Sequence, residues 1–354
     1  MSNLQIGLAI LGGLILVAVV AHSAWSARKN QPRLATPEVA PEHPLVPTAY
    51  DGTAERQEPS FDGDSEPGSL RNLASLMVID RKPGLDALID VITPIVVDDE
   101  TSGEAALAAM PATRRAGSKP FGVEGLNIVT ALWELPTAGQ RYSAFQCGVQ
   151  LANRLGALNQ IEYSEFVMKT QGFADSINGE PEFPEMGDEV ARARELDQFA
   201  SAHDAQLSFT LRALSAAWSP GYVAQNAARL GFVAGSIPGR MVLPVHERGA
   251  APLLGLSFDT QAAMAEDPEQ TALREVTLSL DVPQVPRDEQ PFARLREFAA
   301  ALATSMDGVV IDNNGNPIAP EAMDVIGSEL EQLYDTLDAR DLSAGSVLAR
   351  RLFS

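Results

Sequence analysis

The residue types that most often carry out chemistry are few in this chain and stand far apart. None of its four histidines shares a predicted helix face with a second potential ligand: they are His22, His43, His203 and His246. Zinc needs several ligands that converge on one point, so we expect no metal site. Cys147 is the only cysteine. It lies in an alternating apolar stretch without a basic neighbour, where a thiol packs rather than reacts.

Sequence signatures of catalysis are missing as well. The chain has no Gly-x-Ser-x-Gly elbow for acyl transfer and no Gly-x-x-x-x-Gly-Lys loop for phosphate. Neighbouring carboxylates occur at Glu266 with Asp267 and at Glu329 with Glu331, but an acidic protein has many such pairs on solvated faces. We therefore expect no enzyme, no cofactor and no small-molecule substrate.

The charge balance narrows the choice of partners. Lys and Arg total 26 against 47 Asp and Glu, which gives a net charge of −21. A protein of this charge is repelled by phosphate backbones, so we expect no nucleic-acid partner. A single cysteine also excludes a disulfide framework.

The apolar run near the N-terminus predicts a membrane anchor. Residues 6–21 carry no charged side chain, and with its flanks the run over residues 4–25 approaches the roughly 20 residues that cross a bilayer. Trp25 falls where an interfacial aromatic belongs. A cleaved signal peptide is the alternative, but such a peptide begins with basic residues, and Met1–Asn3 supplies none.

The basic residues follow the apolar run instead, at Arg28, Lys29 and Arg33. By the positive-inside rule, the N-terminus is then periplasmic and everything after the span is cytoplasmic. We therefore predict a single-pass protein of the cell inner membrane, with residues 1–28 as the transmembrane anchor.

Residues 29–75 predict a disordered linker. Seven prolines and scattered acidic residues leave few large apolar side chains there, so no core offsets the entropy of ordering. At about 3.1 Å per residue, the fully extended linker would reach over 100 Å. We interpret it as a spacer.

Residues 76–202 predict an additional α+β domain. Its first strand is expected over residues 85–92, followed by a short helix over residues 103–110. Further strands are expected over residues 122–127, around Trp133 and over residues 142–151, and then helices over residues 159–177 and 186–200. These assignments rest on alternating apolar residues for strands and three-four spacing for helices.

Residues 203–354 predict a second α+β domain. Apolar residues alternate over residues 207–211, 253–258 and 276–282, as in strands with one buried face. Ser219, Pro220 and Gly231 bracket a short helix, since serine caps, proline starts and glycine ends helices. The pattern indicates an antiparallel sheet with helices packed on one face.

The two regions also repeat the same order of elements. The strand at residues 142–151, its following helix and the acidic helix from Met186 parallel the strand at 276–282, the helix from Phe292 and the acidic helix from Met323. A duplicated domain with a degenerate first copy is one interpretation. Two unrelated domains with the same element order is the other.

The last region resembles the C-terminal domain of ZipA, the membrane-tethered anchor of the bacterial division ring. The resemblance is carried by short motifs in the same order: residues 228–235 (Ala-Arg-Leu-Gly-Phe-Val-Ala-Gly), 267–269 (Asp-Pro-Glu), 276–278 (Val-Thr-Leu), 282–283 (Val-Pro) and 307–312 (Asp-Gly-Val-Val-Ile-Asp). An N-terminal span and a proline-rich acidic linker match as well. Residues 76–200 have no counterpart in the usual form of the family.

The resemblance implies that the exposed face of the sheet binds the C-terminal tail of FtsZ. In the family this groove is apolar. On this chain it implies partner-binding residues of mostly polar type: Ser208, Thr210, Arg212, Ile237, Met241, Thr277 and Ser279. Only Ile237 and Met241 keep an apolar character, and Arg212 is placed to pair with an acidic tail residue.

The sequence thus predicts a bitopic inner-membrane cell-division protein. Its cytoplasmic domain binds the FtsZ tail and tethers the division ring to the membrane. The alternative is a membrane-anchored scaffold that binds other envelope or divisome proteins without any contact to FtsZ.

Overall fold

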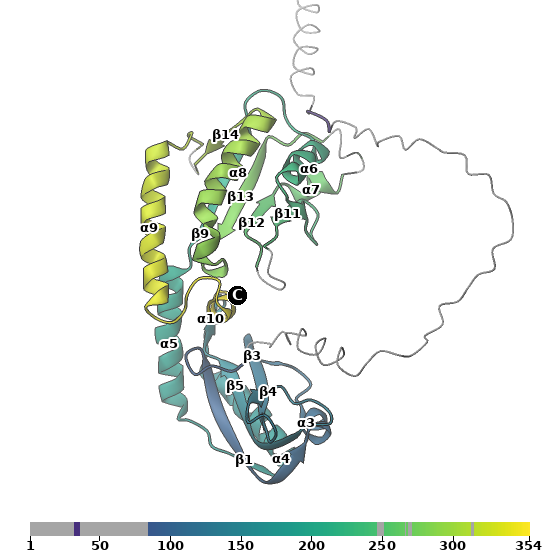
Figure 1. Ribbon diagram of the computed structural model, residues 1–354, viewed down its shortest axis with the longest axis vertical. Coiled ribbons are helices and arrows are strands. Elements are labelled where there is room, and N and C mark those ends of the chain that lie inside the picture. The colour runs from purple at the N-terminus through teal and green to yellow at the C-terminus, as the bar shows by residue number, and fades with distance from the viewer. Residues whose placement is uncertain (1–31, 36–83, 246–250, 266, 268–270, 313–314) are drawn as a thin grey trace, which may run out of the picture. The chain divides into compact units, whose positions relative to one another are not determined.

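The computed structural model describes residues 32–35, 84–245, 251–265, 267, 271–312 and 315–354 (Figure 1). These residues form two antiparallel sheets with helices packed on them, as the α+β prediction requires. The predicted span over residues 4–25 and most of the predicted linker lie outside the described residues. Among the helices that are described, none has both the length and the apolar composition to cross a bilayer.

The first sheet is built from residues 90–181 and is flanked by three helices. Its strands are β1 (Asp90–Ser102), β2 (Arg115–Ala116), β3 (Lys119–Asn127), β4 (Trp133–Glu134), β5 (Arg141–Gln150) and β8 (Gly179–Pro181). They pair in the order β2-β3-β5-β1-β8, with β4 on β3. The helices are α3 (Gly103–Ala109), α4 (Gln160–Ser176) and α5 (Met186–His203), and β6 (Ala152–Asn153) pairs separately with β7 (Gly156–Ala157).

Aromatic side chains fill the space between the first sheet and α4. Phe145 of β5 meets Phe173 of α4 at a ring-centroid distance of 5.5 Å, and Phe121 of β3 meets Phe166 at 6.1 Å. All four rings are buried. Burial of such rings is a large source of stability, which explains why the inner face of this sheet is covered by α4.

The expected first strand over residues 85–92 is misplaced. The backbone turns at residues 87–89, and β1 begins only at Asp90. The Asp86 carboxylate accepts the backbone N–H of Leu88, and the Asp86 carbonyl accepts that of Asp90. Aspartate side chains favour such turns over strands. These local hydrogen bonds form a turn at residues 87–89 in place of the strand that the apolar alternation predicts.

The second sheet follows directly after α5. Its strands are β9 (Gln206–Ala213), β10 (Val233–Ala234), β11 (Arg240–Leu243), β12 (Leu254–Ser257), β13 (Glu275–Asp281) and β14 (Gly308–Ile311). They pair in the order β10-β11-β12-β13-β9-β14. The helices are α6 (Pro220–Arg229), α7 (Thr260–Ala263), α8 (Pro291–Met306), α9 (Pro320–Asp338) and α10 (Val347–Leu352).

Helix α8 runs along one face of this sheet (Figure 1). Leu295, Ala299 and Leu302 are buried at helical spacing, and Phe292 meets Phe209 of β9 at 6.5 Å. Helix α6 begins as predicted, because the Ser219 side chain accepts the backbone N–H of Tyr222 and Pro220 occupies the first turn. These caps satisfy backbone groups that a helix end leaves without partners.

The strands of the two sheets pair in a similar order. In each, the first strand lies between the sheet strand that precedes the long helix and the strand that follows it: β5-β1-β8 around α4 in one and β13-β9-β14 around α8 in the other. In each, a left-handed residue joins the long helix to the edge strand, namely Asn178 (φ 54°) and Asp307 (φ 56°). Glycine follows both, as Gly179 and Gly308. Asparagine and aspartate are the non-glycine residues that most readily adopt this conformation.

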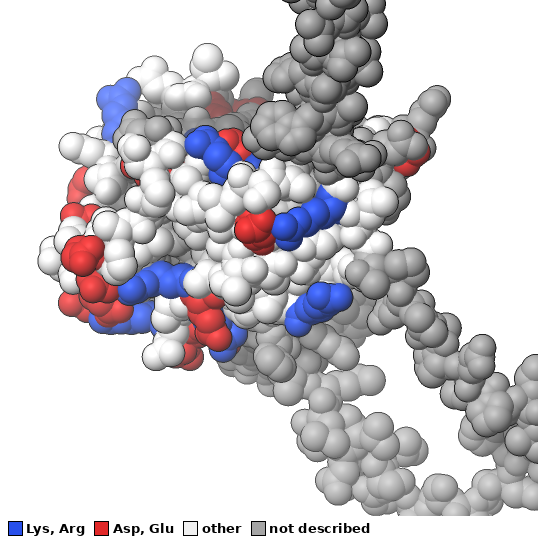
Figure 2. Space-filling model, turned by 90° about the horizontal axis from the view of Figure 1, so that it is seen from above, with Lys and Arg blue, Asp and Glu red and all other residues white. Residues whose placement is uncertain are grey.

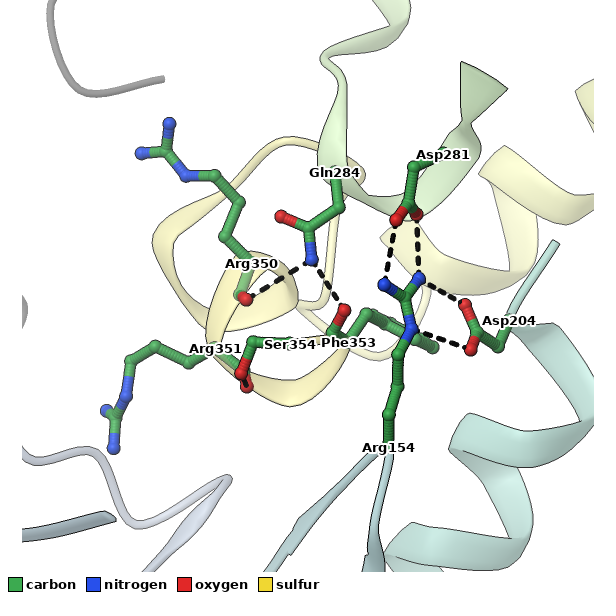
Figure 3. A network of polar contacts seen from close by, with 8 residues as sticks. All are labelled: Arg154, Asp204, Asp281, Gln284, Arg350, Arg351, Phe353 and Ser354. Carbon is green, nitrogen blue, oxygen red and sulfur yellow. Dashed lines mark hydrogen bonds and ion pairs between the residues drawn. The ribbon is translucent and has the colours of Figure 1, made fainter. Parts of the chain in front are cut away.

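The two halves of the chain meet at an arginine with two carboxylate partners (Figure 3). Arg154, in the turn between β6 and β7, donates two hydrogen bonds to Asp204 (2.6 and 2.9 Å) and two to Asp281 (2.7 and 2.8 Å). Asp204 ends α5 and Asp281 ends β13. Paired fork geometry of this kind is the strongest form of charged hydrogen bonding.

The C-terminal helix closes the same junction. Gln284, just after β13, donates to the carbonyl oxygens of Phe353 (2.7 Å) and Arg350 (3.3 Å). Arg351 pairs at 2.5 Å with Asp90, which is fully buried at the start of β1. Burial raises the pKa of Asp90, although the Arg351 guanidinium acts in the opposite direction. The chain's last residues thus connect both sheets.

We predict that Arg154→Ala lowers the free energy of unfolding by about 1–2 kcal/mol. Charged hydrogen bonds contribute about 1.5–3 kcal/mol when shielded, and the 27% residual exposure of this side chain screens part of that. Urea titration followed by circular dichroism measures the change. Arg350→Ala is the control, since its guanidinium points away from the cluster (Figure 3). Equal losses in the two variants would contradict the assignment.

Candidate functional site

The outer face of the second sheet carries small polar side chains in two rows. One row runs across β12, β13 and β9 as Ser257, Thr277 and Thr210. The other row runs across the same strands as Gly255, Ser279 and Ser208. Their neighbours along each strand, such as Leu278 and Phe209, are buried on the opposite face. The structure therefore brings Ser208, Thr210, Thr277 and Ser279 together as the sequence predicted. Glycine and serine on β12 keep this face shallow.

Arg212 extends the same face toward β14 but is already paired. Its Nε donates to Glu275 Oε1 at 2.7 Å across the β9–β13 ladder. Val309 faces it from β14. Arg212 would therefore have to exchange Glu275 for the acidic tail residue that the resemblance implies as its partner. Figure 2 views the molecule from above, where Lys and Arg side chains lie beside Asp and Glu on a largely uncharged surface.

Two predicted residues of this face lie elsewhere. Met241 is only 7% exposed and pairs with Leu256 on the inner, helix-covered face. Ile237 is not in a strand at all, because residues 236–239 form the turn between β10 and β11. The expectation that Met241 remains on the exposed face is wrong. Side chains alternate along a strand, so starting β11 at Arg240 directs Arg240 and Val242 outward and Met241 inward.

The outer face of the first sheet differs in chemistry. There Val96 of β1, 69% exposed, lies opposite Ala144 of β5, and Trp133 of β4 lies opposite Leu126 of β3. Leu85 crosses this face above Gly148, whose missing side chain leaves room for it. The Leu85 backbone N–H donates to the Glu124 carboxylate at 3.0 Å. Exposed apolar side chains therefore lie on the outer face of the first sheet, where the sequence predicted no binding residues.

Lys119 is a buried charged side chain of the first domain, and it is hydrogen-bonded to its neighbours. Lys119, 1% exposed, donates to Asn153 (2.8 Å) and Ser118 (3.0 Å). Burial lowers its pKa, against the attraction of Glu162 and Asp197. Asn153 also lines a cleft of about 260 Å³, together with Asp197 and Phe353. Within the described part of the chain, no three His, Cys, Asp or Glu side chains are grouped to hold a metal ion.

The second domain is thus an α+β domain whose antiparallel sheet has helices packed on one face. Residues 261–329 match a family model described as "ZipA, C-terminal FtsZ-binding domain". The match runs from α7 through β13, α8 and β14 into α9. This part of the chain is therefore similar to the C-terminal domain of ZipA, which confirms the resemblance inferred from its motifs over these residues. No curated protein sequence matches the chain.

We predict that Met241→Asp unfolds the second sheet rather than blocking a binding surface. An uncompensated charge at this buried position costs about 3 kcal/mol or more. Thr277→Asp is the matched control on the outer face and is expected to cost about 1 kcal/mol or less. Denaturant titration of both variants gives the comparison. Similar losses would show that Met241 does not lie in the core.

Cys147 provides a second check on the core. The side chain is fully buried in β5, and burial raises the pKa of the thiol to about 12. The thiolate is the reactive form, so iodoacetamide at pH 8 should leave the native protein unlabelled and modify it fully in 6 M guanidinium. Val96→Cys, at an exposed site, should label in the native state. Modification of Cys147 at the same rate as Val96→Cys would contradict the burial.

Proposed function

We propose that this protein binds FtsZ through its C-terminal domain and holds it at the cell inner membrane. The observation that carries the proposal is the position of the family match, which covers β13 and the helix α8 behind it. These elements set which side chains face outward. Partner binding is assigned to the face formed by Ser208, Thr210, Thr277 and Ser279, with Arg212 at its margin.

The membrane part of the proposal rests on the sequence. The uncharged run within residues 4–25 has the length of a span, and Arg28, Lys29 and Arg33 follow it. This arrangement supports a single-pass protein with a periplasmic N-terminus and cytoplasmic sheets. FtsZ is a cytoskeletal protein of the cytoplasm, so this orientation places the sheets in the compartment where FtsZ is found.

We also infer that the two sheets derive from one duplicated unit. Shared threading supports this, since β2-β3-β5-β1-β8 and β11-β12-β13-β9-β14 place corresponding elements in corresponding positions. The left-handed Asn178 and Asp307, each before a glycine and an edge strand, are a second, independent match. A duplication explains why a ZipA-like chain carries an additional domain of similar order.

The polar outer face predicts a weak contact with the FtsZ tail. If 100 Å² less apolar surface is buried than in an apolar groove, the loss is roughly 2.5 kcal/mol, or nearly a hundredfold in affinity. An ion pair of Arg212 with the tail offsets little of this lost binding free energy. Arg212 would have to give up Glu275 to form it, and exposed ion pairs contribute only about 0–1 kcal/mol. Binding is then only mildly sensitive to salt.

Titration of the FtsZ C-terminal tail peptide against the full chain tests the proposal. Thr277→Arg places a long charged side chain in the middle of the outer face and should weaken binding at least tenfold. Val96→Arg is the matched control, because it makes the same kind of change on the outer face of the first sheet. Fluorescence anisotropy of the labelled peptide gives both dissociation constants.

Each other outcome has a defined meaning. Loss of binding in Val96→Arg but not in Thr277→Arg would move the site to the first sheet and overturn the residue assignment. Failure of the unaltered chain to bind the peptide would overturn FtsZ as the partner. That result would favour the scaffold alternative, in which the chain binds other divisome or envelope proteins.

A further inference from the structure

Four residues just after the candidate membrane span lie against the second sheet domain. Residues 32–35 are described, and Arg33 forms a parallel bridge with Trp218. The Arg33 backbone N–H donates to the Ala217 carbonyl at 2.6 Å, and the Ser219 N–H donates to the Arg33 carbonyl at 2.9 Å. Addition of a short extended segment to an exposed backbone edge is a common mode of peptide recognition.

The receiving edge is held rigidly. Trp218 is fully buried, exchanges two backbone hydrogen bonds of 2.8 Å with Leu273, and donates its indole N–H to the Met306 carbonyl at 2.7 Å. Ser219 caps α6. Edge and helix are thus fixed before residue 33 is added, so little ordering of the receptor is needed on docking.

A side-chain contact adds to the backbone bonds. The Arg33 guanidinium pairs with Asp307 at 2.7 Å. Asp307 is itself fixed, because it ends α8 in the left-handed conformation and its carbonyl accepts the N–H of Leu214. The site therefore binds the docked segment both through backbone hydrogen bonds and through an ion pair.

We propose that the edge at Ala217–Ser219, together with Asp307, is a docking site for the juxtamembrane segment Pro32–Ala35. This inference rests on the proposed membrane anchor for its consequence, but not for the docking itself. Six residues lie between Trp25 and Pro32, and the seven Cα-to-Cα steps, at about 3.3–3.6 Å each, span at most about 25 Å. Docking thus holds the second domain next to the bilayer.

The long linker then has another role than the one expected from its composition. Its composition alone predicts a spacer between the anchor and the folded domains. With Pro32–Ala35 docked, residues 36–83 connect Ala35 to Gly84 and do not set the distance from the membrane to the second domain. The FtsZ-binding domain would be kept at the membrane surface rather than on a tether of over 100 Å.

Hydrogen exchange in the full-length chain tests the docking. Arg33→Pro removes both the N–H that donates to Ala217 and the guanidinium, and exchange of the Ser219 amide should accelerate at least tenfold. Asp307→Asn keeps a residue that tolerates the left-handed conformation and removes only the ion pair, so the acceleration should be at most about fivefold. Leu34→Ala, at an exposed neighbouring side chain, is the control. Unchanged Ser219 exchange in Arg33→Pro would overturn the docking site.

Energy transfer in lipid nanodiscs tests the consequence. Leu214→Cys, 64% exposed beside the docking site, carries the donor, while acceptor lipids mark the bilayer and the buried Cys147 remains unlabelled. Efficient transfer that falls in Arg33→Pro supports the short connection, and equal transfer in both overturns it. If the chain does not insert into nanodiscs, the membrane anchor fails, while the exchange result still decides the docking.

Discussion

The pairing of β9 with β13 is the interaction on which the second domain depends. Seven residue pairs, from Glu275 with Arg212 to Asp281 with Gln206, fix the register of the two central strands. Their buried partners, such as Leu278 and Phe209, then meet α8, and β12 and β14 attach on either side. A slip of one residue would exchange the buried and the outward side chains of a whole strand. The outward polar rows are thus a consequence of the apolar rows behind them.

The two sheets show how one threading supports different surfaces. Both cover one face with a long helix and leave the other open. The open face of the first sheet carries Val96 and Trp133, whereas that of the second carries Thr277 and Ser279. Side chains on an open face contribute little to the core, so they can differ between two sheets whose strands pair in the same order. Binding properties therefore cannot be transferred from one half to the other by fold alone.

Contacts at the ends of elements join these halves. Arg154 bridges the end of α5 to the end of β13, and the buried Asp90 is matched by Arg351 from the C-terminal helix. Removing one partner of such a pair leaves a desolvated charge, so these pairs favour one arrangement over alternatives more than they add stability. Trp218 also joins separate elements, in this case within the second domain. Its backbone pairs with Leu273, and its indole N–H donates to the Met306 carbonyl at the end of α8. Arg33 contacts the second domain at Trp218.

The sequence by itself determined what short-range physics controls. The caps at Ser219 and Pro220, the helices at residues 160–176 and 186–203, and the alternating strands β5, β9 and β13 follow from residues close together in the chain. It also contained the motifs of the family match. Only the tertiary structure decided the inward direction of Met241, the pairing of Arg212 with Glu275 and the position of Arg33 beside Trp218. Each of these depends on a partner or a strand start that no local pattern encodes: Arg212 and Glu275 are 63 residues apart, and Arg33 meets Asp307 across 274 residues.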